Sequence, residues 1–222
     1  MFYTALHTAV PPFLRAIWRP HVEGSANVPP EGPVLLASNH LSFADSVVIP
    51  VVAPRKVVFL AKAEYFTGTG IRGWLSRSWF EGLGMVPVNR EDTRSALDSL
   101  DVALEVLGRG EAFGVYPEGS RSRDGRLYRG RTGVAQLALV SGAPIVPVGL
   151  LGTELLQPVG TRWPRLARVT VRFGRPITVQ GEYDGVAPGR ARRELTDRVM
   201  RDIQQLTGQE AAGVYNERGV AD

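Results

Sequence analysis

Residues 39–45, with the sequence Asn-His-Leu-Ser-Phe-Ala-Asp, are well suited to proton transfer. His40 follows a run of apolar residues, and Asp45 lies five positions further along the chain. A histidine titrates near neutral pH and can take a proton from a hydroxyl group, while a neighbouring carboxylate fixes its tautomer and stabilises the imidazolium. We therefore expect His40 to act as a general base on a hydroxyl that the substrate supplies.

The five-residue spacing limits how His40 and Asp45 can meet. On a regular helix, residues five apart point about 140° away from each other, so the two side chains cannot pair there. If His40 lies in a loop and Ser42 caps the following helix, Asp45 falls in the first turn and its carboxylate can reach back to the imidazole. A structural role is also open, because Ser-x-x-Asp resembles a capping box and acidic residues are favoured in a first turn.

A second polar group follows the predicted strand that ends at Tyr116, in a Pro-Glu-Gly turn. The turn could aim the Glu118 carboxylate and supply backbone N–H groups and guanidinium groups to a phosphate; the alternative is a flexible basic surface loop. Arg90, after another predicted strand, either binds phosphate bidentately or is a solvated charge. The arginines that follow the turn are Arg121, Arg123, Arg126, Arg129 and Arg131.

Composition narrows the classes of function. The 222 residues include no cysteine, which excludes disulfides, thiolate nucleophiles and an acyl-enzyme on cysteine. The formal net charge is +4, and the only lysines are Lys56 and Lys62. A basic, arginine-rich chain favours phosphate-bearing substrates, anionic lipid surfaces or nucleic acid, although an arginine-rich coding bias would give the same charge. Nucleic acid is not expected as a partner, because no aromatic–basic recognition motif is found.

The apolar pattern alternates between short strands and amphipathic helices. Alternation of this kind predicts an α/β fold, with a mostly parallel central sheet flanked by helices on both faces. Ligands of such sheets bind beyond the carboxyl ends of the strands, where residues 39–45, Arg90 and the Pro-Glu-Gly turn fall. Predicted strands cover residues 34–38, 56–61, 84–88, 112–116, 145–150 and 169–173, and predicted helices cover residues 43–52, 71–80, 93–107, 132–140 and 190–206.

The chain divides into an N-terminal amphipathic helix (residues 1–19), one α/β domain (20–207) and a loosely ordered tail (208–222). Apolar residues recur at helical spacing in the first segment, with Arg15 and Arg19 on another side, so we expect it to contact an anionic membrane surface. Residues 71–80 are a second candidate for membrane contact. No run of about 20 apolar residues or signal peptide is found, and we expect a peripheral protein on the cytoplasmic face of the cell membrane.

These segments together resemble the glycerolipid acyltransferases, specifically the 1-acylglycerol-3-phosphate (lysophosphatidate) acyltransferases. That family carries Asn-His-x4-Asp, a strand ending in arginine, Pro-Glu-Gly-Thr-Arg, and a Val-Pro-Val/Ile strand, and all four blocks occur here in that order between about residues 22 and 176. Ser120 replaces the commoner threonine. Lys62 matches a lysine between the first two blocks, and Arg131 stands for lysine in the Lys-Thr-Gly segment of the family.

The resemblance implies an enzyme that transfers a fatty acyl chain from acyl-CoA, or from acyl carrier protein, to the free hydroxyl of 1-acylglycerol 3-phosphate, making phosphatidic acid. His40 would be the general base and Asp45 would orient it. The family needs no metal and no cofactor beyond the acyl donor. Residues that would bind the lysophospholipid acceptor and its phosphate are Lys62, Arg90, Glu118, Gly119, Ser120, Arg121 and Arg131.

Other functions remain open at this stage. The same chemistry could act on glycerol 3-phosphate, another lysophospholipid or a glycolipid. A lipid hydrolase would need a nucleophile elbow such as Gly-x-Ser-x-Gly, which is not found. A non-catalytic membrane-binding module is a third possibility, against which the intact set of His40, Asp45, Glu118 and Arg121 argues.

Overall fold

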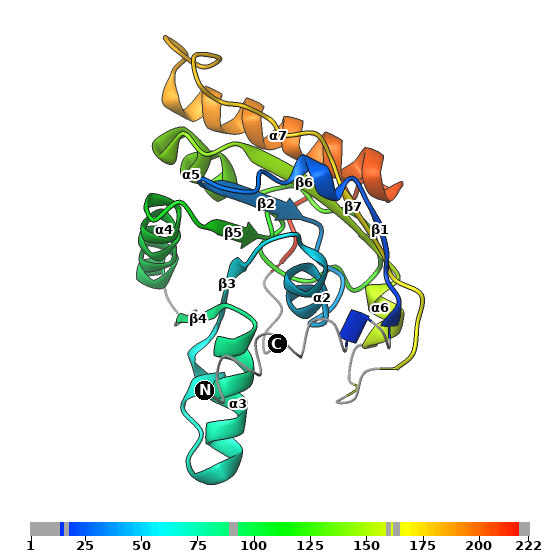
Figure 1. Cartoon of the computed structure of the whole chain (residues 1–222). Helices are drawn as coiled ribbons and strands as arrows, with labels where there is room; N and C mark the ends of the chain where they lie inside the picture. Colours follow the sequence, from blue (N-terminus) through cyan, green and yellow to red (C-terminus); the bar gives the residue numbers. More distant parts are fainter. Residues whose placement is uncertain (1–13, 16–17, 89–92, 159–160, 162–164, 218–222) are drawn as a thin grey trace.

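A seven-stranded sheet forms the centre of the computed structural model (Figure 1), which describes residues 14–15, 18–88, 93–158, 161 and 165–217. The strand order is β1-β7-β6-β2-β5-β3-β4. Neighbouring strands are parallel except β6 and β7, which are antiparallel. The strands are β1 (His21–Glu23), β2 (Val34–Ser38), β3 (Val57–Lys62), β4 (Met85–Val88), β5 (Ala112–Val115), β6 (Ile145–Leu151) and β7 (Thr170–Phe173).

Helices cover both faces of this sheet, which confirms the predicted fold class. One apolar cluster joins α4, α5 and α7 to one face, and the other joins α2, α3 and α6 to the opposite face (Figure 1). The helices are α2 (Asp45–Val52), α3 (Gly70–Gly82), α4 (Thr93–Gly108), α5 (Gly133–Ser141), α6 (Thr153–Leu156) and α7 (Pro188–Thr207), with short 3-10 helices η1 (Ser25–Asn27) and η2 (Ala63–Phe66).

Strand β2 lies in the middle of the sheet between β5 and β6. All five of its residues are buried, as expected for a continuous apolar run in a parallel sheet covered on both faces. Because β2 and β5 are parallel, the loops that follow them leave the sheet at the same edge. The sequence after β2 contains His40, and the sequence after β5 contains Glu118, so the fold brings together two segments that are distant in sequence.

The described part of the N-terminal segment packs on the domain. Leu14 is buried in the core, and the Arg15 guanidinium donates to the carbonyl oxygens of Val51 and Ala53 at the end of α2. Most of residues 1–19 lies outside the described residues, so the amphipathic helix stays a prediction. No helix in the described ranges is both long and apolar enough to span a bilayer.

Residues 209–217, here called the C-terminal segment, differ from the expected loosely ordered tail. They run beside residues 125–131 and are held there by backbone hydrogen bonds, with Leu127 paired in parallel with Ala211. This pairing is not predictable from the sequence, because the segment is largely polar and its apolar residues do not recur at helix or strand spacing. Its partners lie more than eighty positions earlier in the chain.

Candidate active site

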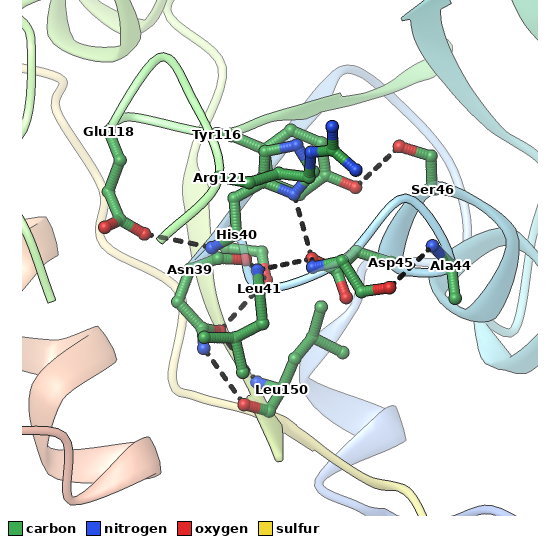
Figure 2. A network of polar contacts seen from close by, with 12 residues as sticks. Asn39, His40, Leu41, Ala44, Asp45, Ser46, Tyr116, Glu118, Arg121 and Leu150 are labelled. Atoms are coloured by element: carbon green, nitrogen blue, oxygen red, sulfur yellow. Dashed lines mark hydrogen bonds and ion pairs between the residues drawn. The ribbon is translucent and has the colours of Figure 1, made fainter. Parts of the chain in front are cut away.

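His40 and Asp45 are in direct contact at the carboxyl end of β2 (Figure 2). The distance from His40 Nδ1 to Asp45 Oδ2 is 2.8 Å. The Asp45 side chain is fully buried, whereas 14% of the His40 side chain remains exposed. Because a carboxylate only accepts hydrogen bonds, Nδ1 carries the proton and the lone pair is on Nε2. This is the tautomer in which Nε2 can take a proton from a hydroxyl group.

Asp45 also holds the loop that carries His40. Its Oδ2 accepts hydrogen bonds from the backbone N–H groups of Leu41 (2.7 Å) and Ser42 (2.9 Å). Helix α2 therefore begins at Asp45 rather than at residue 43, and Ala44 rather than Ser42 is its N-cap. The expected reach of Asp45 back from the first turn is confirmed, but the expected cap is wrong. One carboxylate oxygen orients the histidine and shapes the turn.

Asn39 fixes the start of the same loop to the neighbouring strand. Its side-chain amide donates to the Leu150 carbonyl (2.9 Å) and accepts from the Leu150 N–H (2.8 Å), so it pairs with β6 much as a backbone peptide would. The side chain is fully buried, which makes these hydrogen bonds costly to break. The position of His40 is thus set from both sides, by Asn39 before it and by Asp45 after it.

Glu118 is a buried carboxylate that joins two loops. Oε1 accepts from the backbone N–H of His40 and Oε2 from that of Tyr128, both at 2.9 Å. The His40 carbonyl in turn accepts the Ser122 N–H at 2.7 Å. Burial raises the pKa of Glu118 to about 7, even though the two N–H donors act to lower it. Both hydrogen bonds of the Glu118 carboxylate in the structure are thus with backbone N–H groups of the site.

Tyr116, at the end of β5, lies flat on the imidazole (Figure 2). The two ring centroids are 3.8 Å apart with an interplanar angle of 7°, and the Tyr116 hydroxyl lies 2.9 Å from Ser46 Oγ on α2. From the sequence, Tyr116 is only the last residue of a predicted strand. Tyr116 comes directly before Pro-Glu-Gly and follows a strand parallel to the one before His40. This position in the sequence could have indicated that Tyr116 lies near His40.

The Pro-Glu-Gly loop contains the other expected binding residues. Gly119 is exposed and has a φ of 82°, a conformation that favours glycine. The Ser120 hydroxyl is buried without a hydrogen-bond partner among the described residues. Arg121 is half-buried and belongs to the network around His40 (Figure 2). Arg131 is exposed; its side chain lies against Gly119, and Nη2 donates to the Asn216 carbonyl.

The remaining expected residues lie at the neighbouring strands. Lys62 is half-buried and ends β3, opposite Val88 of β4. Arg90 lies outside the described residues. In the part of the chain that the structure describes, no three His, Asp or Glu side chains gather into a group that could hold a metal ion.

The comparison with protein families agrees with this arrangement. The sequence model of the family described as acyltransferase matches residues 19–151, more than half of the chain. The chain belongs to the acyltransferase family. His40, Asp45 and Glu118 all lie within the matched residues, whereas β7, α7 and the C-terminal segment lie beyond them.

Similar proteins carry a more specific name. The chloroplast 1-acyl-sn-glycerol-3-phosphate acyltransferase of Arabidopsis thaliana is 34% identical over 142 residues, which make up 64% of this chain and 38% of that protein. The alpha form from Bos taurus is 28% identical over 188 residues, or 83% of this chain and 61% of its own. This chain spans only about 40% of the length of the Arabidopsis thaliana and Brassica napus proteins that it matches.

A solved structure shares the fold. The crystal structure of the 1-acyl-sn-glycerophosphate acyltransferase of Thermotoga maritima superposes with a TM-score of 0.64 at 24% identity, covering 90% of this chain and 80% of that chain. The likeness extends beyond the residues that the family model matches, so the helices and strands after residue 151 belong to the same architecture.

Proposed function

We propose that this acyltransferase moves a fatty acyl chain from a thioester donor to the free hydroxyl of 1-acylglycerol 3-phosphate, forming phosphatidic acid. The observation that carries the proposal is the contact between His40 Nδ1 and the buried Asp45 carboxylate, which leaves Nε2 as the basic nitrogen. The names of the similar proteins support the choice of acceptor.

The proposed reaction needs one proton carrier. His40 Nε2 takes the proton of the acceptor hydroxyl while the hydroxyl oxygen attacks the thioester carbonyl, and Asp45 stabilises the imidazolium that forms. The tetrahedral intermediate then expels the thiolate, which receives the proton from Nε2. A general base contributes roughly 10²–10⁴-fold to such a rate. Because a thioester is already activated, positioning of the two substrates supplies the remainder, and no cofactor is required.

The acceptor phosphate is proposed to bind beside the Pro-Glu-Gly loop. Arg121 belongs to the network around His40, and the buried Ser120 hydroxyl lies next to it in the chain, so a phosphate there would place the acceptor hydroxyl near Nε2. Arg90 and Lys62 are proposed to assist from the ends of β4 and β3, and Arg131 from its place against Gly119. A guanidinium group suits a phosphate because it can donate two parallel hydrogen bonds.

The lipid substrates imply a membrane surface, and we propose a peripheral position on the cytoplasmic face. Helix α3 supports this, because it exposes three large apolar side chains: Ile71 (78%), Trp74 (52%) and Leu75 (55%). Full burial of such a side chain contributes roughly 1.5–3 kcal/mol, so three of them would support reversible binding to anionic lipid.

An acceptor panel tests the proposal. The purified chain is given labelled oleoyl-CoA or oleoyl-acyl carrier protein with 1-acylglycerol 3-phosphate, glycerol 3-phosphate, lysophosphatidylcholine or water alone. We expect labelled phosphatidic acid and a free thiol only with the first acceptor. Transfer to another acceptor in its place would reject the assigned substrate, and thiol release with water alone at the same rate would indicate a hydrolase.

A further inference from the structure

The C-terminal segment pairs with the loop that follows β5 along most of its length. The Leu127 N–H donates to the Glu210 carbonyl (2.8 Å), the Ala212 N–H to the Leu127 carbonyl (2.9 Å), and the Arg129 N–H to the Val214 carbonyl (2.9 Å). These contacts are between backbone groups, so they hold the segment against the loop without depending on side-chain identity.

Gln209 ties the first end of the segment to the loop that carries His40. Its Oε1 accepts from Asn39 Nδ2 at 2.9 Å, and its Nε2 donates to the Gly125 carbonyl at 2.7 Å. Asn39 already pairs with Leu150 of β6, so Gln209 completes the hydrogen bonding of the residue directly before His40. The Gln209 side chain therefore links the loop that carries His40 to the loop that follows β5.

Asn216 ties the other end to the residues expected to bind phosphate. Its Nδ2 donates to the carbonyl oxygens of Ser120 (3.3 Å) and Arg121 (3.0 Å), and its own carbonyl accepts from Arg131 Nη2 (3.1 Å). Asn216 is thus bonded to the backbone of Ser120 and Arg121 and to the Arg131 side chain, three residues proposed to bind the phosphate.

Tyr215 contacts three arginines at the same end of the C-terminal segment. The guanidinium carbons of Arg129 and Arg131 lie 5.1 Å and 5.8 Å from the centre of its ring, and its hydroxyl accepts from Arg193 Nη1 of α7 at 3.2 Å. Cation–π contacts of this geometry are favourable and fix the directions of both arginines. The segment is thus braced against α7 as well as against the loop.

We infer that the C-terminal segment is a positioning element whose two ends act on different steps: Gln209 positions the His40 loop for proton transfer, and Asn216 positions Ser120 and Arg121 for binding of the acceptor phosphate. The inference rests on the proposed function for the identity of the acceptor. Gln209 and Asn216 both lie outside residues 19–151, which match the family model. The C-terminal segment therefore adds to the site from beyond that part of the chain.

The test compares three variants of the full chain: Gln209→Ala, Asn216→Ala and, as a control, Glu210→Ala. The Glu210 side chain is exposed, and the contact of this residue with the loop is through its backbone carbonyl, which the substitution keeps. For each variant, kcat and the KM values for oleoyl-CoA and 1-acylglycerol 3-phosphate are measured. Hydrogen exchange is followed at the Ser122 and Tyr128 amides, which bond to His40 and Glu118.

Each variant has its own expected result. Loss of one or two neutral hydrogen bonds corresponds to about 3- to 10-fold. We expect Asn216→Ala to raise the KM for the acceptor by that factor with the KM for oleoyl-CoA unchanged. We expect Gln209→Ala to lower kcat by a similar factor with the KM for the acceptor unchanged. Exchange at the Ser122 amide should be faster in both variants, and the control should match the parent protein.

The opposite results would overturn the inference. Equal changes in kcat and in both KM values would mean that the segment contributes only to folding. Unchanged kinetics together with unchanged exchange at Ser122 would mean that it positions nothing. If the parent protein transfers no acyl chain to 1-acylglycerol 3-phosphate, the proposed function fails, and the exchange measurement still decides whether the segment holds the loop.

Discussion

At the scale of single residues, the two buried carboxylates of the site accept hydrogen bonds from backbone N–H groups. Asp45 Oδ2 contacts both the imidazole and two backbone N–H groups, and Glu118 joins the backbone of His40 to that of Tyr128. A substitution at either position therefore changes the geometry of the loop together with its charge. Experiments on these residues need a readout of stability beside a readout of activity.

Glu118 should make stability depend on pH. The pKa of Glu118 rises from 4.5 to about 7 on folding, so the folded state binds the proton of this carboxyl group more tightly than the unfolded state does. The corresponding stabilisation is complete below about pH 4.5 and is lost as the pH rises through 7, at most about 3 kcal/mol for a shift of this size. We expect the free energy of unfolding to fall over this range.

The comparison with Glu118→Gln isolates this residue, because every other titrating group is present in both proteins. Urea unfolding at pH 5 and pH 8 should show a larger fall for the parent than for the variant. A variant with the same pH dependence as the parent would show that Glu118 does not titrate in that range.

At the scale of helices and strands, the sequence predicts those elements whose apolar residues form a clear pattern. Strand β2 was predicted at its observed bounds, and most other elements lie within a few residues of their predicted ends, because buried runs and amphipathic periods mark them. Strand β1 and helix α6 are not among the predicted elements. Strand β1 has three residues at a sheet edge and α6 has four, too few to show an apolar pattern.

The contacts between elements were harder to predict than the elements. The pairing of His40 with Asp45 is an expectation from the local sequence, because the two residues lie only five positions apart. The place of Tyr116 after a strand parallel to β2 hints that it lies near His40, but the stacking of the two rings is seen only in the folded chain. The hydrogen bond between Asn39 and Gln209 joins segments that are far apart in sequence, and no sequence pattern indicates it. Arg90 lies outside the described residues and its role stays a prediction.

Gly114 of β5 links the sheet to the site through aromatic contacts. A Cβ atom on Gly114 would lie 2.0 Å from Phe59 Cζ, and the Phe59 ring is 5.6 Å from that of Tyr116, which stacks on His40. We expect Gly114→Ala to lower the free energy of unfolding by about 1–3 kcal/mol, the usual cost of overpacking, and to lower kcat by displacing Tyr116. Urea unfolding and initial rates measure both effects.

Two further variants act as controls for Gly114. A Cβ atom on Gly108, at the end of α4, meets nothing within 4 Å, so Gly108→Ala should leave stability and activity at least at the parent level. Phe59→Leu makes room, so the double variant with Gly114→Ala should be more stable than the sum of the single changes indicates. Strict additivity would count against the proposed clash.

At the scale of the whole molecule, α3 extends away from the sheet, at the opposite end from α5 and α7 (Figure 1). We expect serine substitutions at Ile71, Trp74 and Leu75 together to lower co-sedimentation with anionic vesicles at least 10-fold, because about 1.5–3 kcal/mol is lost for each buried side chain. Val140→Ser on α5 is the matched control, since that side chain is 57% exposed at the other end. Equal binding of the triple variant and the control would argue against docking through α3.

The central claim is that His40 is the general base of acyl transfer, and the variant His40→Ala tests it most directly. The substitution keeps the backbone hydrogen bonds of His40 to Glu118 and Ser122, so the protein should still fold, which circular dichroism and thermal unfolding would verify. With oleoyl-CoA and 1-acylglycerol 3-phosphate at saturation, kcat should fall at least about 10²-fold. A folded His40→Ala protein that turns over at nearly the parent rate would contradict the mechanism.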